Sequence, residues 1–400
     1  MNGRHFAIFT QLGNGHVYPT LSLCRELVRR GHRVTYATND HYSPMIVATG
    51  AEPVVLRNMR LPDDIKEKVR HGRGLPITDP RSQAAFRSWR SYALADAAAL
   101  LPQIQSVYKN DAPDLVLYDH YHIPGRLFAK MWNIPTVQIS AHFAYYNGLA
   151  LRRNGISENP EALIEWSHDV DSFYMKYGIY SRGSFWHLEK LNIYFIPKEF
   201  QHNCESFDDR FCFVGSMFDR PFRHIWKDCS NGKPIILISG LSQFKGMGAS
   251  GLRDFDIFTA ALSESPYHCI LSIGDEDFDR DIPPNFEINR HASHLEILPH
   301  AALSLCHGGT GSTLEAIYNA APPLMVPQTE FCDEVAYRAE ELGIGVRLPR
   351  AELSVENVKN TIARMLDDTD LKNRVIGMRE VFMRSGGAKM AADRIEGCVA

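Results

Sequence analysis

The chain lacks the features that mark membrane, nucleic-acid-binding and disulfide-bonded proteins. No apolar run approaches the roughly 20 residues that span a bilayer, and the opening residues lead into an apolar strand rather than a signal peptide. The formal net charge is only −4, without the basic excess typical of nucleic-acid binding. None of the eight cysteines forms a C-x-x-C pair, so we expect reduced core thiols in a cytoplasmic protein.

What the sequence does contain is an alternation of short apolar strands and helices, with 44% hydrophobic residues in a chain of 400. The segments "HFAIFT", "HRVTYAT", "AEPVVL", "PDLVLYD" and "IPTVQIS" have the character of buried strands. Pro19 is expected in the first turn of a helix that Gly31 terminates, and a long helix is expected over 82–108. The alternation predicts parallel sheets with crossover helices, an α/β fold class.

The alternation restarts at "KPIILIS" and continues through "YHCILSIG", "FEINR", "LSLC" and "PPLMVP". We therefore predict two α/β domains, 1–215 and 233–380, joined by a polar, turn-rich linker over 216–232. A last helix within 381–400 could pack on either domain, including back on the N-terminal one. Ligands of open parallel sheets bind beyond the carboxyl ends of the strands, so we expect the "QLGNGH" and "CHGGTGS" loops to border one cleft.

The stretch "CHGGTGSTLEAI" combines three glycines with a helical pattern. The glycines allow close approach of the backbone to a ligand, and free N–H groups at a helix N-terminus suit phosphate oxygens. Ser312 or Thr313 is expected to cap the helix, with Glu315 in its first turn. His307 can donate a ring N–H to the same anion, and Glu315 can accept from ribose hydroxyls. The alternative is an ordinary capped turn between a strand and a helix.

Several linked motifs carry a family resemblance. The segments "GNGHVYPTLSLCRELVRRGHRVTYAT" and "HGGTGSTLEAIYNAAPPLMVPQ", followed by "RAEELGIGVRL", resemble the UDP-glycosyltransferases of the GT-B fold, in the bacterial macrolide and natural-product branch. The resemblance runs from about Phe6 to past Leu348. It implies two Rossmann-like domains, with the acceptor mainly on the N-terminal domain and the nucleotide sugar on the C-terminal one.

The resemblance also implies catalytic roles for two residues. His16 matches the general base that takes a proton from the acceptor hydroxyl, and Asp119 matches the carboxylate that orients this histidine. Read without the resemblance, His16 could be a solvated loop histidine and Asp119 a helix cap.

The resemblance assigns further residues to the two substrates. Asn14, His142 and Phe143 would line the acceptor pocket, although aromatic residues such as those in "AHFAYYNG" are at least as often part of a core. Residues that would bind the donor are Ser239, Ser242, His291, Ala292, His294, His307, Gly309, Gly311, Ser312, Thr313 and Glu315.

The chain departs from the family pattern in three places. "HASH" replaces Trp-x-Pro-Gln, so that His291 would stack on the base over a smaller area and His294 would take the glutamine slot. "ISGLSQ" exchanges a Gly and a Leu relative to Ser-Leu-Gly-Ser. An acid-Gln pair that holds sugar hydroxyls is replaced by Phe331 and Cys332, which are poor partners for them. A deoxy or otherwise unusual donor sugar is the hypothesis, unless Glu330 or Asp333 takes over the role.

The sequence thus predicts an inverting, metal-independent glycosyltransferase without a cofactor. It would transfer a sugar from a nucleoside diphosphate to a hydroxyl of a small natural product. A UDP-sugar is favoured and a dTDP-deoxysugar is possible. The alternatives are a catalytically inactive partner of the same fold, a nucleotide-sugar epimerase and, on "GNGHVY", an NAD(P)-dependent enzyme. A metal site is not expected, because the histidines lack a matching ligand set. The acceptor and the oligomeric state stay open.

Overall fold

The computed structural model describes 3–57, 62–72, 80–146, 149–150, 160–180, 187–215, 217–218, 226–240, 249–273, 280–290 and 293–399. The chain folds into two compact units. The first unit comprises Met1–Lys66, Phe86–Phe222 and Ser385–Ala400, and the second comprises Glu67–Ala85 and Arg223–Arg384. Part of the expected linker, 216 and 219–225, lies outside the described residues.

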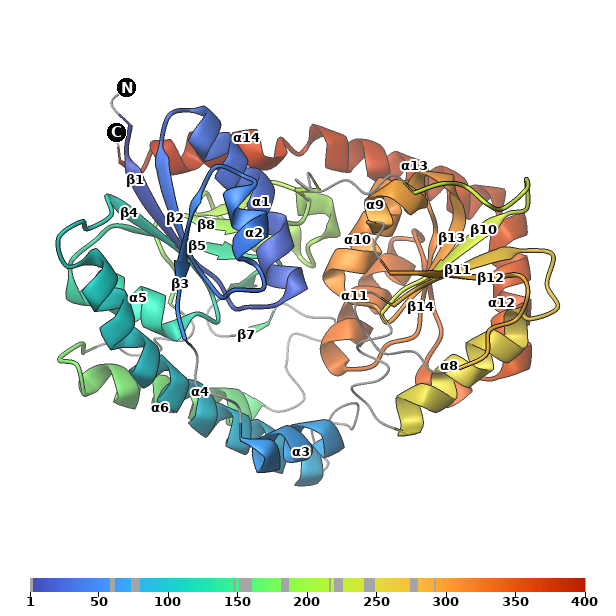
Figure 1. Ribbon diagram of the computed structural model, residues 1–400, viewed down its shortest axis with the longest axis horizontal. Helices are drawn as coiled ribbons and strands as arrows, with labels where there is room; N and C mark the ends of the chain where they lie inside the picture. Colours follow the sequence, from blue (N-terminus) through green and yellow to red (C-terminus); the bar gives the residue numbers. More distant parts are fainter. Residues whose placement is uncertain are drawn as a thin grey trace. The chain divides into compact units, whose positions relative to one another are not determined.

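The first unit is built on a parallel sheet with the strand order β3-β2-β1-β4-β5-β8-β9 (Figure 1). Its strands are β1 (His5–Phe9), β2 (Arg33–Thr38), β3 (Glu52–Val55), β4 (Leu115–Asp119), β5 (Thr136–Ser140), β8 (Asn192–Tyr194) and β9 (Phe211–Phe213). Its helices are α1 (Asn14–Arg29), α2 (Ser43–Val47), α5 (Ile123–Met131), α6 (Pro160–Met175) and α14 (Gly387–Glu396), with the short turns η2 (Lys198–Phe200) and η3 (Cys204–Ser206). The pair β6 (Tyr145–Tyr146) and β7 (Leu149–Ala150) forms a small antiparallel hairpin.

Two helices are divided between the units. They are α3 (Asp63–Gly72) and α4 (Pro80–Tyr108), and the greater part of α4, from Phe86 on, belongs to the first unit. The range of α4 confirms the long helix that was expected over 82–108.

The alternation of side chains along the strands divides the first core into two layers. Phe6 and Ile8 of β1 face α1, α2 and α14 in one buried cluster. Ala7 and Phe9 face α4, α5 and α6 in the other. Burial on both faces explains why the strands are apolar throughout rather than alternating with polar residues.

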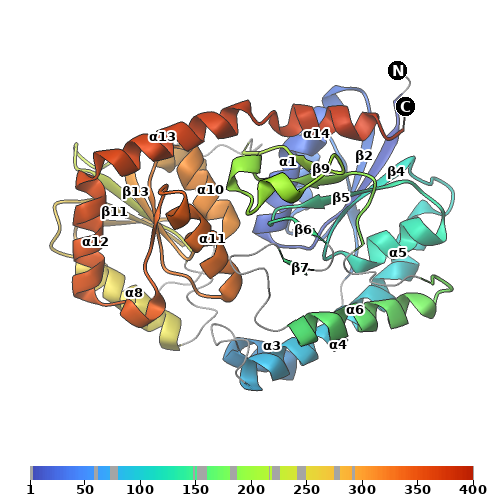
Figure 2. The ribbon, with the colours of Figure 1, turned by 180° about the vertical axis from the view of Figure 1, so that it is seen from behind.

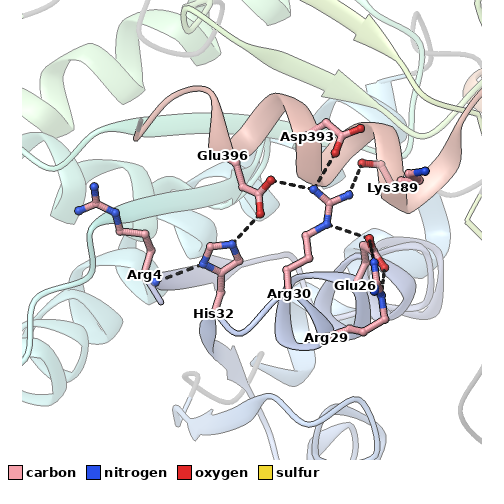
Figure 3. Close-up of polar contacts among 8 residues, drawn as sticks. All are labelled: Arg4, Glu26, Arg29, Arg30, His32, Lys389, Asp393 and Glu396. Atoms are coloured by element: carbon pink, nitrogen blue, oxygen red, sulfur yellow. Dashed lines mark hydrogen bonds and ion pairs between the residues drawn. The ribbon is translucent and has the colours of Figure 1, made fainter. Parts of the chain in front are cut away.

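The end of the chain returns to this first unit. Helix α14 lies along α1, as both views of the ribbon show (Figures 1 and 2), and Ala391, Ala392 and Ile395 join the core beneath it. A polar network closes over these contacts (Figure 3). Glu396 accepts from Arg30 at 2.7 Å and pairs with His32 at 2.8 Å.

The second unit contains a parallel sheet with the order β12-β11-β10-β13-β14-β15. Its strands are β10 (Ile235–Ile238), β11 (His268–Ser272), β12 (Phe286–Asn289), β13 (Ala301–Cys306), β14 (Pro323–Met325) and β15 (Val346–Arg347). Its helices are α8 (Ala249–Leu262), α9 (His294–Ile297), α10 (Thr310–Tyr318), α11 (Glu330–Glu341), α12 (Val355–Asp367) and α13 (Thr369–Arg384), with the turns η4 (Leu298–His300) and η5 (Arg350–Glu352). The two sheets confirm the predicted α/β class.

Two local expectations for the first helix have different outcomes. Gly31, at φ +87°, ends α1 as predicted: its N–H donates to Val28 O, and the N–H of His32 donates to Leu27 O. Pro19, however, lies inside α1 and not in its first turn. The expectation was wrong because the extended backbone at Gly13 starts the helix at Asn14. His16 therefore belongs to the first turn of the helix and not to a loop.

All eight cysteines are free thiols. The expected core position holds for the buried thiols, which are Cys24, Cys212, Cys269, Cys306 and Cys332. It is wrong for Cys229 and Cys398, which are exposed, and Cys204 is partly buried. Within the part of the chain that the structure describes, no helix is both long and apolar enough to cross a membrane.

Candidate active site

Both sheets place polar residues where their strand order reverses, which is where ligands of open parallel sheets bind. In the first unit, β1 lies between β2 and β4. The helices that follow β1 and β4 pack on opposite faces of the sheet, because α1 belongs to one buried cluster and α5 to the other. In the second unit, β10 and β13 are the corresponding pair. Each unit therefore provides one candidate site, and each is described separately below.

The first site centres on His16 and Asp119. The Nδ1 of His16, in the first turn of α1, lies 2.7 Å from Oδ2 of Asp119, the last residue of β4. The N–H of Tyr121 donates to the other carboxylate oxygen at 2.9 Å. His16 is 15% exposed and Asp119 is 5% exposed at the side chain. His16 is thus not a solvated loop histidine, and His122, not Asp119, caps α5.

The electrostatics distinguish His16 from its histidine neighbours. Burial opposes its protonation, but the attraction and hydrogen bond of Asp119 outweigh burial and raise the pKa of His16 above 6.5. Burial also opposes ionisation of Asp119, yet His16 lowers the pKa of that carboxyl. Burial lowers the pKa of His120 and of His122 to about 4. An imidazole paired with a carboxylate thus lies near two histidines that stay neutral at pH 7.

The residues expected in the acceptor pocket have different surroundings. The ring of His142 meets that of His16 edge to face, with centroids 4.9 Å apart. The side chain of Asn14 accepts a hydrogen bond from the Tyr42 hydroxyl at 2.9 Å. Phe143 instead stacks on Phe200 in the core, with centroids 5.5 Å apart. His142 therefore lies against His16 and Asn14 contacts Tyr42, and the acceptor roles of all three residues stay predictions.

The second site is the glycine loop between β13 and α10. Helix α10 begins at Thr310 with Gly309 as its N-cap, which has no side-chain cap bond. The expected cap at Ser312 or Thr313 is therefore wrong. Because the turn after His307 uses glycine conformations, the helix starts earlier than the Ser-Thr pair. Ser312 donates back to Gly309 O at 3.2 Å, and Thr313 is fully buried. The amides at the start of α10 remain the groups that suit an anion.

Two glycines confine the ring of His307. A Cβ on Gly240, at φ +94°, would lie 2.4 Å from its Nδ1, and a Cβ on Gly309 would lie 2.5 Å from its Nε2. Any side chain at either position would displace the imidazole. Gly240, the glycine whose place in "ISGLSQ" differs from the family pattern, is thus required because the ring of His307 leaves no room for a side chain there. Ser239, the neighbour of Gly240, is buried with no partner for its hydroxyl among the described residues.

Glu315 lies deeper in α10 than expected, beyond its first turn. Its Oε2 lies 3.3 Å from Nδ1 of His294, whose Nε2 is 2.9 Å from the hydroxyl of Ser272. The histidine in the glutamine slot and the proposed ribose-binding carboxylate are therefore neighbours. A nucleotide hydroxyl that enters here would meet a carboxylate already oriented by an imidazole.

The segment expected to hold the donor sugar forms the start of α11. Thr329 caps this helix by accepting from the N–H of Cys332 at 3.2 Å, and Cys332 is buried. A Cβ on Gly308 would lie 2.7 Å from the carbonyl oxygen of Cys332, so this residue packs against the glycine loop. Arg347 binds both carboxylate oxygens of Asp333, at 2.5 and 3.0 Å.

The pairing of Asp333 bears on which acid could serve the sugar. A carboxylate that Arg347 holds at both oxygens would have to break this ion pair before it could bind sugar hydroxyls. A role for Glu330, the other acid considered from the sequence, stays a prediction. Phe331 is partly buried.

Three of the expected donor-binding residues, Ser242, His291 and Ala292, lie outside the described residues. Conversely, sequence reasoning missed Tyr121, Tyr42, Ser272 and the steric role of Gly240. Tyr121 could have been found from "DHYH", where it follows the catalytic candidate by two residues. Tyr42 and Ser272 carry no such signal, because their partners lie far away in the chain. Among the described residues, no three His, Cys, Asp or Glu side chains are placed to hold a metal ion.

Comparisons with known proteins identify relatives of this chain. Residues 269–387 match the erythromycin biosynthesis protein CIII-like C-terminal domain. The chain is 32% identical to the NDP-glycosyltransferase YjiC of Bacillus subtilis, over 99% of this chain and 97% of that protein. It is 28% identical to the oleandomycin glycosyltransferase of Streptomyces antibioticus, over 98% and 90%.

A solved structure extends the likeness to the fold. The calicheamicin glycosyltransferase CalG4 superposes with a TM-score of 0.80 at 29% identity, covering 100% of this chain and 99% of that one. The two parallel sheets thus form a GT-B architecture. The chain belongs to the NDP-glycosyltransferase family, in the branch of the macrolide and natural-product glycosyltransferases.

Proposed function

We propose that this glycosyltransferase moves a sugar from a nucleoside diphosphate to a hydroxyl of a small natural product, with inversion at the anomeric carbon. The observation that carries the proposal is the 2.7 Å contact between His16 and Asp119 where the strand order of the first sheet reverses. The relatives named for oleandomycin and calicheamicin support this class of acceptor.

The reaction follows from the state of the base. With Nδ1 directed to Asp119, the Nε2 of His16 is the nitrogen left to accept the acceptor's hydroxyl proton. The acceptor oxygen bonds to the anomeric carbon as the bond from that carbon to the diphosphate oxygen breaks, and the electron pair leaves with the diphosphate. Attack opposite the leaving group inverts the centre. Asp119 stabilises the imidazolium without taking the proton.

The glycine loop supports the donor side of the proposal. The amides at the start of α10 can donate to the diphosphate as it gains charge. The buried hydroxyl of Ser239 is a further donor that lacks a partner within the described chain. No step in this scheme requires a metal ion or a cofactor. Glu315 can accept from a ribose 2′-hydroxyl, which favours UDP over dTDP.

The donor sugar is the finer part of the proposal. Phe331 and Cys332 give few partners to hydroxyls, and Asp333 is bound by Arg347. We therefore favour a sugar with fewer hydroxyls than an ordinary hexose. Transfer assays with a panel of nucleotide sugars test whether the donor is a deoxy sugar. A strong preference for glucose that is lost in Glu330→Gln would replace the deoxy-sugar hypothesis.

The first experiment is calorimetric titration with UDP and dTDP in metal-free buffer, repeated on Glu315→Ala and Ser312→Ala. Tight UDP binding that Glu315→Ala weakens would support the assignment of donor and base. No binding of either nucleotide would favour an inactive partner protein. Incubation with donor alone adds a second test, because conversion of the sugar without an acceptor would indicate an epimerase.

The anomeric configuration of the product tests inversion. NMR of the purified glycoside gives this configuration directly, for comparison with that of the donor. Retention would contradict a single displacement with His16 as the base.

A further inference from the structure

A hydrogen bond to Asp119 alone does not fix the imidazole of His16. A ring held at one nitrogen can still swing about its side-chain torsions and carry Nε2 away from the reacting hydroxyl. Misplacement by about 1 Å costs on the order of 10²-fold in rate. Other contacts must therefore hold the ring, and they come from two side chains that the proposed chemistry does not use.

The rings of two residues, His142 and Tyr121, meet the imidazole of His16. His142 lies edge to face with His16, with centroids 4.9 Å apart and planes at 78°. Tyr121 lies edge to face with His16 at 6.2 Å and 87°, and with His142 at 5.8 Å and 78°. Edge-to-face contacts are the preferred geometry of aromatic pairs. The rings of His142 and Tyr121 thus support each other as well as the base.

The two supporting rings are themselves held by the backbone. Tyr121 donates its N–H to Asp119, the same carboxylate that binds His16. His142 follows β5 by two residues, and its N–H donates to the hydroxyl of Ser140 at 3.1 Å. Because β5 pairs with β4, with Ile139 opposite Asp119, the sheet brings the backbone of His142 beside the carboxylate.

We propose that His142 is a positioning residue for the base, whose ring, together with that of Tyr121, holds the imidazole of His16 on Asp119. The inference rests on the proposed function and gives His142 a role other than lining the acceptor pocket. It predicts an effect on turnover rather than on acceptor binding. It also predicts that ring shape, and not the nitrogen atoms of His142, carries the effect.

The test compares His142→Ala with His142→Phe. Both variants remove a titratable imidazole, but only the Ala variant removes the ring, so their difference isolates the packing. We expect kcat of the Phe variant to stay within about twofold of the wild type, and kcat of the Ala variant to fall about tenfold with little change in acceptor KM. The pKa of His16, followed by NMR of labelled histidine, should be lower in the Ala variant than in the Phe variant.

The groups that face His16 decide how the titration is interpreted. They are the carboxylate of Asp119, the phenol of Tyr121 and the imidazole of His142, with His120 and His122 near the carboxylate. Loss of the His142 imidazole affects the Ala and Phe variants alike, and the other groups are common to both. A lower pKa in the Ala variant therefore reports a looser contact with Asp119.

The outcomes separate the hypotheses. The same His16 pKa in both variants, or a higher acceptor KM at unchanged kcat, would overturn the positioning role. A Phe variant as impaired as the Ala variant would also overturn it, because the nitrogens would then be the functional atoms. Full activity in His16→Ala would instead contradict the proposed base, while the NMR comparison would still report on the packing.

Discussion

The two candidate sites occupy the same place in two similar sheets, yet they are built from different parts of the chain. In the first unit, side chains make the site: an imidazole, a carboxylate and two supporting rings. In the second unit, the backbone makes it, and glycines bring amides and the ring of His307 together. A nucleophilic step needs a titratable group, whereas a leaving diphosphate needs fixed donors. Under the proposed function, the same topology thus supports two kinds of chemistry.

The comparison predicts that the sites can be disabled one at a time, and the largest effect should come from His16→Ala. Loss of the base should reduce kcat for transfer by about 10²–10⁴-fold. Affinity for UDP should not change, because the glycine loop is untouched. Transfer assays and calorimetry on the same preparation check both statements. A parallel loss of UDP affinity would show that the sites are not separable.

Asp119→Asn should have the next largest effect, a fall in kcat of about 10²-fold. It should also move the pH profile. The reactive imidazole is neutral, so the rate falls as the pH drops through the pKa of His16. Asp119 raises this pKa above 6.5, and its replacement should therefore shift the fall in rate to lower pH. Rates measured from pH 5 to 9 test the shift. An unmoved or alkaline-shifted profile would contradict the pairing.

Gly240→Ala should affect the second site alone and cost about tenfold in UDP affinity, since a Cβ at this position meets His307 at 2.4 Å. The matched control is Gly232→Ala. Gly232 has a similar backbone, at φ +81°, but a Cβ there would meet no atom within 4 Å. Gly232→Ala therefore introduces the same strain of a positive φ as Gly240→Ala, but its Cβ clashes with no other residue. Equal affinities in both variants would mean that the place of His307 does not matter.

The smallest effect should come from Glu396→Gln, which weakens the network between α14 and α1. We expect a loss of about 1 kcal/mol in the free energy of unfolding of the first unit, with UDP affinity retained. Glu380→Gln is the control, because its partner Arg384 is 71% exposed and such pairs contribute little. Thermal unfolding with and without UDP measures the change. Equal melting temperatures for the two variants would show that the network between α14 and α1 does not stabilise the first unit.

The fold was largely predictable because its signals are local. Buried parallel strands are apolar throughout, and Gly31 marks a helix end by its backbone alone. The pairing of His16 with Asp119, 103 residues apart, was accessible only through family resemblance. The contacts of Tyr121 with His16 and of Gly240 with His307 were missed, because ring packing and steric room are settled by tertiary structure. The helix starts at Asn14 and Thr310 were also missed, since glycine caps at Gly13 and Gly309 leave no side-chain signal.

The return of α14 to α1 has a consequence for how the protein is made. A ribosome synthesises β1 and α1 first, but the residues that complete the core beneath α1, Ala391 and Ile395, emerge only after the entire second unit. The apolar face of α1 in the first unit therefore stays uncovered while residues 223–384, about two fifths of the chain, are translated. We therefore expect chaperones to protect that face during synthesis. We also expect poor yields of chains that stop before Gly387.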